Sequence, residues 1–258
     1  MKNDANEIKK YWETRAGGDS SIQSTTMDIW LRDIETSVVI NALKEKEFNL
    51  VCDIGCGDGT TTIKCAETYP LISFTGFDYA ENMIKNAQSN ADKSSIKNIK
   101  FEIKDLTKIT QFNEYEFVYS TRCLINLANW QAQKEAINNI RNILMPGGFY
   151  LMIENFIEGH DQFNSIRKKF SLPEIPIREH NTFFHRGALL DYLKSDFYII
   201  SEENISSIYY IVSRIIYSAI CKQENVIPDY NDIHHQLASK LPYMGEYGPL
   251  RAVYLQKK

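Results

Sequence analysis

Residues 51–60 read VCDIGCGDGT, an apolar run that passes through three alternate glycines toward a segment of helical character. Glycine accepts positive φ and has no Cβ, so the chain can pass under a nucleoside-sized molecule at van der Waals distance. The spacing is G-x-G-x-G, and Thr60 stands where the dinucleotide fingerprint G-x-G-x-x-G has its third glycine. Asp53 lies two residues before the first glycine, where a carboxylate would repel a pyrophosphate. The turn therefore predicts a ligand that has a cationic group and no phosphate.

Length, composition and charge restrict the class of protein. The 258 residues, 43% of them hydrophobic, suffice for one large domain with a real core. The formal net charge is -4 and the lysines and arginines are scattered, which argues against a nucleic-acid partner. No run approaches the roughly 18 apolar residues of a membrane span, and the opening MKNDANEIKK leads into no apolar signal segment. We expect a cytoplasmic protein with a small-molecule substrate and no membrane or nucleic-acid partner; the sequence leaves monomer or homodimer open.

The cysteines and the paired histidines give no sign of a metal site. The five cysteines are odd in number and form no C-x-x-C pair, which argues against a disulfide framework and against zinc. His234 and His235 adjoin in sequence, so they would diverge on a helix, and no carboxylate cluster accompanies them. We expect no metal, and we expect the cysteines to be small core residues.

Apolar runs of strand length alternate with segments of helical period in the middle of the chain. Such alternation predicts a parallel sheet covered by helices on both faces. The expected strands are residues 50–54, 72–77, 99–103, 117–120 and 149–153, and the expected helices are residues 60–68, 80–91 and 130–144. The last of these helices leads into the sequence MPGG at residues 145–148, which predicts a stop and a turn.

Further elements are expected on either side of this alternation. Residues at helical spacing predict helices at 7–15, 26–45, 205–221 and 229–240, and strands are expected at 197–201 and 250–256. Residues 155–185 are mixed in character and predict an insertion over the C-terminal edge of the sheet. Because no internal repeat or low-complexity linker is visible, we expect one domain over residues 1–258.

Polar residues follow four of the expected strands. Asp53 closes the first strand, Asp78 closes the second and Asp105 follows the third, while residues 120–122 follow the fourth. Ligands bind beyond the C-terminal ends of parallel strands, so we expect these residues to meet at one site. A carboxylate after the second strand can accept both hydroxyls of a ribose. Asp105, beside the backbone N–H of Leu106, can read adenine without any phosphate contact. The alternative is that these acids are solvated loop residues, as most Asp are.

These features resemble the class I S-adenosylmethionine-dependent methyltransferases. The motif D-x-G-x-G-x-G, the ribose acid, the adenine-reading acid and the segment after the fourth strand match that family in order and spacing. The resemblance covers residues 50–154. It implies an α/β three-layer sandwich whose seven-stranded, mostly parallel, Rossmann-like sheet ends in an antiparallel strand, here residues 250–256. It also implies S-adenosyl-L-methionine as cofactor and S-adenosyl-L-homocysteine as product.

The resemblance also assigns parts of the chain and cofactor-binding residues. Residues 1–48 would form N-terminal lid helices, residues 49–154 the cofactor-binding core, and residues 155–195 and 205–248 two helical lid insertions over the substrate. The residues expected to bind the cofactor are Tyr11, Trp12, Arg15, Asp53, Gly55, Cys56, Gly57, Asp78, Tyr79, Met83, Asp105, Leu106, Ser120 and Thr121. The ordinary alternatives are apolar packing of a terminal helix for Tyr11 and Trp12, and a surface cation for Arg15.

Methyl transfer sets the demands on the remaining residues. A sulfonium methyl is already activated, so the enzyme must mainly hold a nucleophile about 3–3.5 Å away in a dry site. A hydroxyl needs a general base, whereas an amine needs at most a proton acceptor. His180 and Glu154 are the catalytic candidates, with a surface or capping histidine and a salt-bridged glutamate as the alternatives. The candidates for substrate binding are Arg122, Asn126, Arg167, Asn181, Phe184, Tyr209, Tyr210 and Arg214.

Two short segments bear on the substrate. Residues 122–127 and 180–184 resemble those of bacterial methyltransferases that act on small polar metabolites and surface-polysaccharide precursors. This resemblance implies a hydroxyl or amine on a sugar or phosphorylated precursor as methyl acceptor. A second hypothesis keeps the fold without catalysis, as a cofactor-binding assembly or regulatory subunit. A nicotinamide-dependent oxidoreductase is disfavoured by Asp53 and by the missing third glycine.

Overall fold

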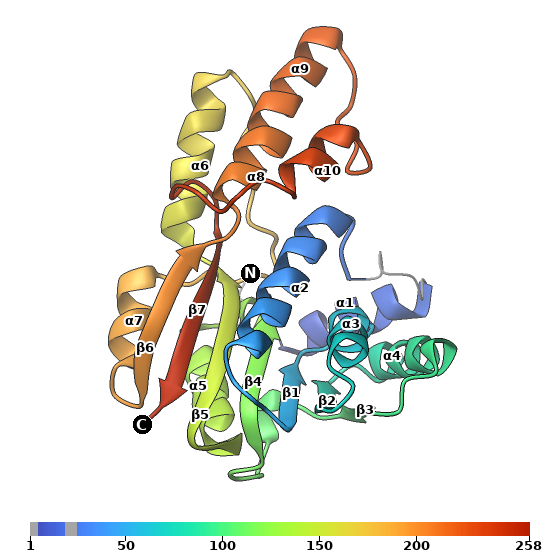
Figure 1. Ribbon diagram of the computed structural model, residues 1–258. Coiled ribbons are helices and arrows are strands. Elements are labelled where there is room, and N and C mark those ends of the chain that lie inside the picture. The colour runs from blue at the N-terminus through green and yellow to red at the C-terminus, as the bar shows by residue number, and fades with distance from the viewer. Residues whose placement is uncertain (1–4, 19–24) are drawn as a thin grey trace.

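The structure is a computed structural model that describes residues 5–18 and 25–258. Within these residues a seven-stranded sheet lies at the centre, in the order β3-β2-β1-β4-β5-β7-β6 (Figure 1). Its strands are β1 (Leu50–Ile54), β2 (Ser73–Asp78), β3 (Ile99–Ile103), β4 (Tyr115–Thr121), β5 (Leu144–Asn155), β6 (Phe197–Asn204) and β7 (Leu250–Lys257). The first five strands pair in parallel, and β7 runs antiparallel to both of its neighbours. The predicted sheet, with its antiparallel last strand, is confirmed.

Helices cover both faces of this sheet and rise above one end of it (Figure 1). They are α1 (Ala5–Gly18), α2 (Ile29–Lys44), α3 (Thr60–Thr68), α4 (Glu81–Ser94), α5 (Trp130–Ile143), α6 (Ile157–Lys169), α7 (Arg186–Leu193), α8 (Ser207–Ile211), α9 (Tyr217–Glu224) and α10 (Ile233–Ala238). Two 3-10 turns, η2 (Leu106–Lys108) and η3 (Leu124–Asn126), and a π-helix, η4 (Val212–Ile216), complete the order. None of the helices in the described ranges is long and apolar enough to cross a membrane.

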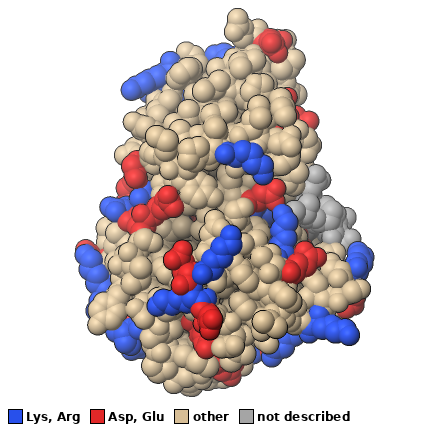
Figure 2. Space-filling model, in the orientation of Figure 1, with Lys and Arg blue, Asp and Glu red and all other residues tan. Residues whose placement is uncertain are grey.

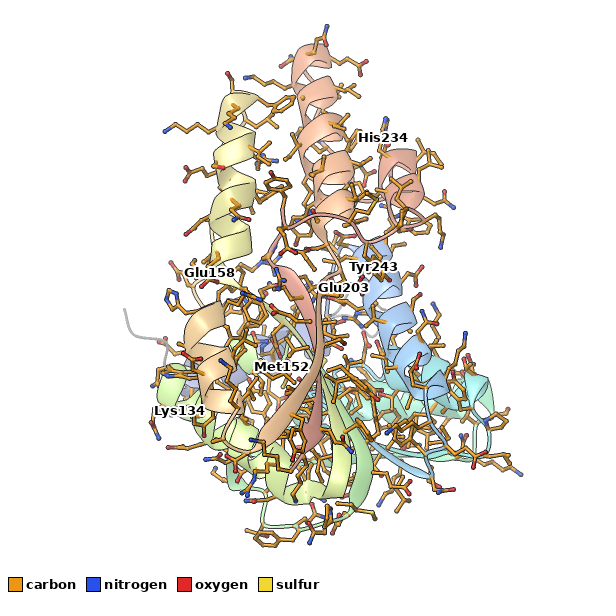
Figure 3. All side chains as sticks on the ribbon, turned by 60° about the vertical axis from the view of Figure 1, so that its left-hand side comes forward. Lys134, Met152, Glu158, Glu203, His234 and Tyr243 are labelled. Atoms are coloured by element: carbon orange, nitrogen blue, oxygen red, sulfur yellow. The ribbon has the colours of Figure 1, made fainter. Side chains whose placement is uncertain are left out.

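The strands alternate their side chains between two apolar cores, as a period of two requires. Phe117 and Tyr119 of β4 join a core that includes Val39 of α2, whereas Val118 joins the opposite core with Ile140 of α5. Met152 of β5 belongs to this second core and lies in the interior of the sheet in Figure 3. The alternation explains why the central strands read as continuous apolar runs, since both of their faces are buried.

The helices above the sheet form a separate layer. We call residues 156–185 and 205–248, which include α6 and the stretch from α8 to α10, the lid. In Figure 1 the lid stands over the end of the sheet where the parallel strands finish, and Figure 3 marks it with Glu158 and His234. The backbone N–H of Arg186 donates to Glu158 Oε1 at 2.9 Å, which ties the start of α6 to α7. The lid therefore lies over the end of the sheet at which a ligand is expected.

Charge on the visible face follows the composition. Figure 2 shows that Lys and Arg lie interspersed with Asp and Glu over the lower part of that face, while the upper part is largely uncharged. Interspersed charges of both signs differ from the continuous basic stripe of a nucleic-acid footprint. This face therefore offers no such footprint.

Several element boundaries differ from those predicted. The helix expected to reach residue 144 ends at Ile143, and the MPGG sequence lies inside β5 rather than in a turn. A register shift between Tyr115 and Phe117 of β4 absorbs these residues, and Gly147 adopts φ 73° there. Between the pairs Tyr115↔Leu144 and Phe117↔Phe149, four residues of β5 face one residue of β4, so the pairing of the two strands is interrupted there.

The lid is more helical and more broken than its sequence indicates. Residues 155–185 contain α6, which the sequence reading missed because its buried face carries His160 and Arg167 beside Phe163. The helix predicted at 205–221 is divided by the π-helix η4, and the helix predicted at 229–240 shortens to α10. α7 lies within the predicted insertion 155–195 yet packs on the sheet through buried Leu189 and Leu193.

Candidate active site

The glycine turn after β1 has the backbone geometry that its sequence predicts. Gly55 and Gly57 adopt φ 72° and 55°, which glycine alone takes without strain. A Cβ on Gly55 would overlap the Sγ of Cys123, and a Cβ on Gly57 would lie 2.9 Å from Thr25 Cγ2. The backbone N–H groups of Gly55 and Cys56 donate to the carbonyl of Phe77 at 2.7 and 3.0 Å, which fixes the turn beside β2. Side chains are therefore excluded where the turn faces the cavity.

Two buried carboxylates support this turn. Asp53 accepts a hydrogen bond from the hydroxyl of Thr62 at 2.6 Å, and burial raises its pKa to about 7. Asp78 accepts from the backbone N–H groups of Gly57 at 3.0 Å and Ala80 at 2.9 Å. Burial raises the pKa of Asp78 to about 6, against the opposing effect of these two donors. Because a buried carboxyl is costly when charged, a cation beside it would favour the ionised form.

A cavity extends from the glycine turn into the lid. Many of the residues predicted for the site line it together: Trp12, Asp53, Gly55, Cys56, Gly57, Asp78, Tyr79, Met83, Thr121, Arg122, Asn126, His180, Asn181, Tyr210 and Arg214. Its walls thus come from the N-terminal helix, the ends of β1, β2 and β4, and the lid. The remaining predicted residues lie outside the lining.

Helix α1 is held over the cavity by its contact with α4. The carboxylate of Glu13 accepts from the backbone N–H groups of Glu81 at 2.7 Å and Asn82 at 3.1 Å, and so caps the N-terminus of α4. This bond places Trp12 against Met83, with which it forms a small apolar cluster. The cap therefore fixes one wall of the cavity.

His180 joins α1 to the lid. Its ring stacks on Tyr11 with 4.3 Å between centroids and meets Trp12 edge-on at 5.9 Å. Burial lowers the pKa of His180, and the positive charges of Arg178 and Arg15 lower it further. His180 is therefore an uncharged imidazole at neutral pH, capable of accepting a proton. The hydroxyl of Tyr11 accepts a hydrogen bond from Arg15 at 3.4 Å, and neither of these two residues lines the cavity.

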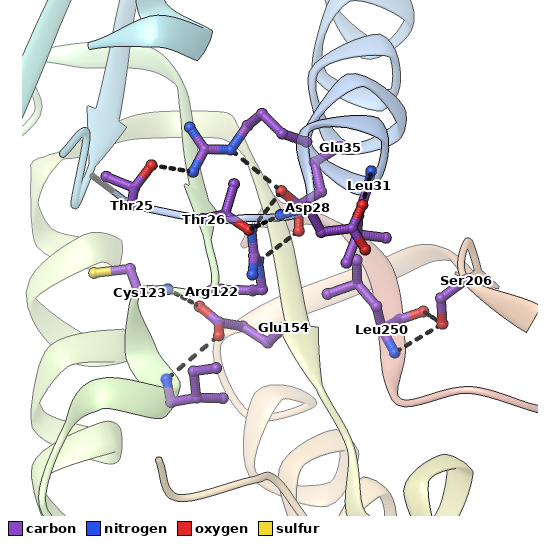
Figure 4. A network of polar contacts seen from close by, with 12 residues as sticks. Thr25, Thr26, Asp28, Leu31, Glu35, Arg122, Cys123, Glu154, Ser206 and Leu250 are labelled. Atoms are coloured by element: carbon purple, nitrogen blue, oxygen red, sulfur yellow. Dashed lines mark hydrogen bonds and ion pairs between the residues drawn. The ribbon is translucent and has the colours of Figure 1, made fainter. Parts of the chain in front are cut away.

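Glu154 lies away from the cavity and holds the turn after β4. It is fully buried, and its Oε1 accepts from the backbone N–H groups of Cys123 at 3.0 Å and Leu124 at 2.8 Å (Figure 4). Its Oε2 accepts from the N–H of Ile125 at 3.3 Å. Burial raises its pKa to about 8, against the effect of these donors. This geometry gives no support to Glu154 as a base acting on substrate.

The turn that Glu154 holds carries Arg122 in an unusual conformation. Arg122 has φ 48°, in the left-handed region that is strained for a residue other than glycine. Its Nε lies 2.6 Å from Oε1 of Glu35, which is fully buried in α2, and its Nη2 donates to Oε2 at 3.0 Å. Its carbonyl accepts from Asn126 Nδ2 at 2.7 Å. A strained residue held from both ends is typical of functional sites.

A second ion pair joins α2 to the lid. Asp28 accepts from Arg214 at 2.5 Å and from the hydroxyl of Tyr209 at 2.5 Å. Tyr209 also lies 2.9 Å from Nδ1 of His235, so its buried hydroxyl belongs to this network and not to the cavity lining. Arg214 sits on the π-helix and places its guanidinium 4.3 Å from the ring centroid of Tyr210. Such helix bulges often occur at functional sites.

The other predicted residues outside the lining have structural partners. Asp105 caps η2 by accepting from the N–H of Thr107 at 3.0 Å, and Leu106 is buried behind it. The remaining three are Ser120, whose hydroxyl pairs with that of Tyr150 at 2.8 Å, Arg167, which donates to the carbonyl of Pro173 at 2.8 Å, and Phe184, which lies in the core.

Asn155 and His160 are among the lining residues that the sequence did not predict. Asn155 ends β5 directly after Glu154, so the rule that ligands meet strand ends could have found it. His160 lies in α6, where burial lowers its pKa, and its Nε2 is 3.2 Å from Asn164 Nδ2. Across the two described ranges no group of histidine, cysteine and acidic side chains could hold a metal ion.

The fold and the site define an α/β protein with a cavity that runs from a glycine turn to the lid. Residues 46–204 match the family described as methyltransferase domain, and the chain belongs to that family. Among curated relatives, it is 27% identical over 120 residues to a malonyl-[acyl-carrier protein] O-methyltransferase of Bacillus cereus, covering 46% of this chain and 41% of the relative. It is 27% identical to a demethylmenaquinone methyltransferase of Leptospira interrogans, covering 55% and 57%. The chain thus spans roughly half the length of these relatives.

Solved structures share the fold at low sequence identity. The N-methyltransferase NodS from Bradyrhizobium japonicum, in complex with S-adenosyl-L-homocysteine, has a TM-score of 0.61 at 11% identity and covers 97% of this chain and 98% of its own. A phosphoethanolamine N-methyltransferase of Haemonchus contortus has a TM-score of 0.65 at 14% identity, covering 98% and 48%. The [4+2]-cyclase SpnF has a TM-score of 0.60 at 17% identity, covering 87% and 80%. Since one of these is named a cyclase, the fold alone does not define the reaction.

Proposed function

We propose that this chain transfers the methyl group of S-adenosylmethionine to a hydroxyl or amine of a small polar molecule. The observation that carries the proposal is the glycine turn at Gly55 and Gly57, which faces a cavity that the lid closes. Two buried acids with raised pKa values, Asp53 and Asp78, lie beside this turn. A bare backbone beside buried acids suits a cationic nucleoside better than a pyrophosphate.

The cofactor is proposed to lie along the sheet end from β4 to β3. Gly55, Cys56 and Gly57 would contact its centre, Asp78 its ribose, and Tyr79 and Met83 with Trp12 the wall beside it. Asp105 and Leu106, at the end of β3, would take the adenine at the outer edge. The backbone at Ser120 and Thr121 would meet the methionine part, and Tyr11 and Arg15 would act from α1. Bound there, S-adenosylmethionine supplies an activated methyl group.

The acceptor is proposed to bind between the turn after β4 and the lid. Arg122, Asn126, Asn181, Tyr210 and Arg214 line this half of the cavity. His180, uncharged and beside α1, is the candidate to accept a proton or hydrogen-bond the substrate. Arg167 and Tyr209 would act by holding the lid together, through the carbonyl of Pro173 and the ring of His235. Phe184 would join the lid to the core.

The proposed acceptor class rests on two short segments of the chain and not on the named relatives. The named relatives act on a malonyl-[acyl-carrier protein] and on demethylmenaquinone, so their substrates are chemically diverse. A sugar or phosphorylated surface-polysaccharide precursor remains our proposed acceptor, on the basis of residues 122–127 and 180–184. Mixed aromatic and cationic walls, as at Tyr210 and Arg214, suit such a molecule.

Calorimetry with S-adenosylhomocysteine tests the proposal directly. We expect the intact protein to bind it at one site per chain, and an absence of binding would overturn the proposal. A panel of amines, alcohols and sugar nucleotides with S-adenosylmethionine then tests turnover by release of S-adenosylhomocysteine. Tight cofactor binding without turnover across the panel would favour the alternative of a non-catalytic assembly or regulatory subunit.

A further inference from the structure

Three polar atoms at the ends of β4 and β5 are buried without a hydrogen-bond partner. They are Thr121 Oγ1, Asn126 Oδ1 and Asn155 Oδ1, which have no partner within residues 5–18 and 25–258. All three residues line the cavity. Buried polar atoms are nearly always paired, so three orphans in one cavity point to a ligand that supplies the missing partners.

The side chain of Asn126 is fixed in one orientation. Its Nδ2 donates to the carbonyl of Arg122 at 2.7 Å, which leaves Oδ1 as the unpaired end of the amide. Arg122 is itself locked, because Glu35 holds its guanidinium and its N–H donates to the carbonyl of Ile153 at 2.8 Å. The orphan oxygen of Asn126 is thus an acceptor held in place by the strained turn.

Asn155 meets this turn from the neighbouring strand. It lies two residues after Ile153, the residue whose carbonyl accepts from Arg122. Its own carbonyl accepts from the N–H of Phe184 at 3.0 Å, so its backbone is fixed. The residue is only 9% exposed and lines the cavity, and its Oδ1 is buried and unpaired among the described residues. Asn126, in the turn η3 after β4, and Asn155, at the end of β5, therefore supply the two unpaired amide oxygens.

The carboxylates that line the cavity are already engaged. Asp28 pairs with Arg214, Asp53 accepts from Thr62, and Asp78 accepts from two backbone N–H groups. His180, the uncharged imidazole of the lining, lies against Tyr11 and Trp12 of α1. A donor group that enters beside the ends of β4 and β5 therefore meets neutral amide oxygens there. An amide oxygen accepts a hydrogen bond but removes no proton at neutral pH. That environment suits an amine, which attacks through its own lone pair, better than a hydroxyl, which must lose a proton.

We propose that Asn126 and Asn155 hold the N–H groups of the methyl acceptor beside the transferred methyl, and that the acceptor is a primary or secondary amine. This assignment rests on the proposed methyltransferase function. In the transfer, the nitrogen lone pair forms the bond to the methyl carbon while the carbon–sulfur bond breaks and its electron pair stays on sulfur. The methylated ammonium then releases one proton to water. Thr121 Oγ1 is adjacent and is left to the methionine part of the cofactor.

Sinefungin tests this assignment without knowledge of the acceptor. In this analogue a carbon that bears a primary amine replaces the sulfur and its methyl, while the adenosine and amino-acid parts match those of S-adenosylhomocysteine. We expect the wild-type protein to bind sinefungin more tightly than S-adenosylhomocysteine in calorimetry. We expect Asn155→Leu and Asn126→Leu to weaken sinefungin about tenfold, as the loss of a hydrogen bond to a charged amine predicts, and to leave S-adenosylhomocysteine within about twofold.

Two further variants keep the test decisive. Asn155→Asp retains an acceptor and adds negative charge, so it should preserve or raise the preference for sinefungin. Asn41→Leu changes an exposed asparagine of α2 outside the cavity lining and should alter neither affinity. Equal loss of both ligands in the leucine variants would assign the asparagines to the shared amino-acid part and overturn the inference. So would unchanged affinity for both. Failure of the wild-type protein to bind S-adenosylhomocysteine would instead contradict the proposed methyltransferase function, on which this inference rests.

Discussion

The two halves of the cavity are built by different means. The half at the glycine turn comes from short segments around Gly55 and Asp78, and backbone hydrogen bonds such as Gly55 N–H to Phe77 carbonyl hold it. The lid half is assembled from separate segments, and side-chain ion pairs hold it, among them the pair of Arg214 and Asp28, 186 residues apart in sequence. A site held by local backbone geometry tolerates little change at its glycines. A site held by side chains that are distant in sequence depends on both members of each ion pair.

The largest effect is expected from a single methyl group in the glycine turn. Gly55→Ala places a Cβ against Cys123 Sγ at a residue with φ 72°. Displacement of the turn should weaken S-adenosylhomocysteine at least about a hundredfold in calorimetry, because the ligand contacts bare backbone. Gly187→Ala is the matched control, since a Cβ there meets nothing within 4 Å. Retained affinity in Gly55→Ala, with the thermal transition unchanged, would remove the glycine turn from the ligand site.

The second-largest effect is expected in the lid half of the cavity, where an ion pair joins distant segments. Arg214→Met leaves Asp28 buried beside Tyr209 without its cation. Breaking a buried ion pair by removing one partner should cost about 3–5 kcal/mol in the free energy of unfolding, measured in urea. Asp28→Asn added to Arg214→Met should recover part of that loss. The exposed pair of Lys194 and Asp191 is the control, and its disruption should cost less than about 1 kcal/mol.

If the loss of unfolding free energy in the double variant equals the sum of the losses in Arg214→Met and Asp28→Asn, the two effects are independent and the ion pair does not hold the lid. A double-mutant cycle gives this coupling directly, because Asp28 and Arg214 contact each other. Loss of lid stability with retained affinity for S-adenosylhomocysteine would sharpen the comparison, since it would show that the two halves of the cavity fail separately.

The difference between local backbone geometry and distant side-chain pairs also explains which parts of the structure could be predicted from the sequence. The turn from Asp53 to Gly59 follows from residues adjacent in the chain, so its geometry and its place after β1 were predictable. The sheet followed as well, because strands buried on both faces leave continuous apolar runs such as β4. A site can thus be predicted from the sequence where one segment supplies both the backbone geometry and the ligand contacts.

The helices of the lid were harder to predict from the sequence because their buried faces carry polar residues. His160 and Arg167 occupy the inner side of α6, so a search for apolar periodicity passes over that helix. Glu154 was interpreted as a catalytic candidate from its strand-end position, and only the fold shows its three backbone partners. Asn155, one residue further, lines the cavity instead. Successive side chains of a strand point to opposite faces of the sheet. Two neighbouring residues at a strand end therefore have different surroundings, and only one of them meets the ligand.

The smallest effect is a pH dependence in the glycine-turn half. Burial raises the pKa of Asp53 from 3.8 to about 7, so the folded protein keeps this proton to higher pH than the unfolded chain does. The stabilising contribution is therefore complete below the unfolded pKa and is lost as pH rises toward 7, by about 2 kcal/mol between about pH 5 and about pH 7. Asp53→Asn should flatten the fall in unfolding free energy over that range by this amount, measured by urea denaturation at each pH. Parallel curves for the two proteins would mean that Asp53 does not titrate there. Because Thr62 can donate to an asparagine oxygen as it does to the carboxylate, a flattened curve would isolate the charge of Asp53 from its hydrogen bond.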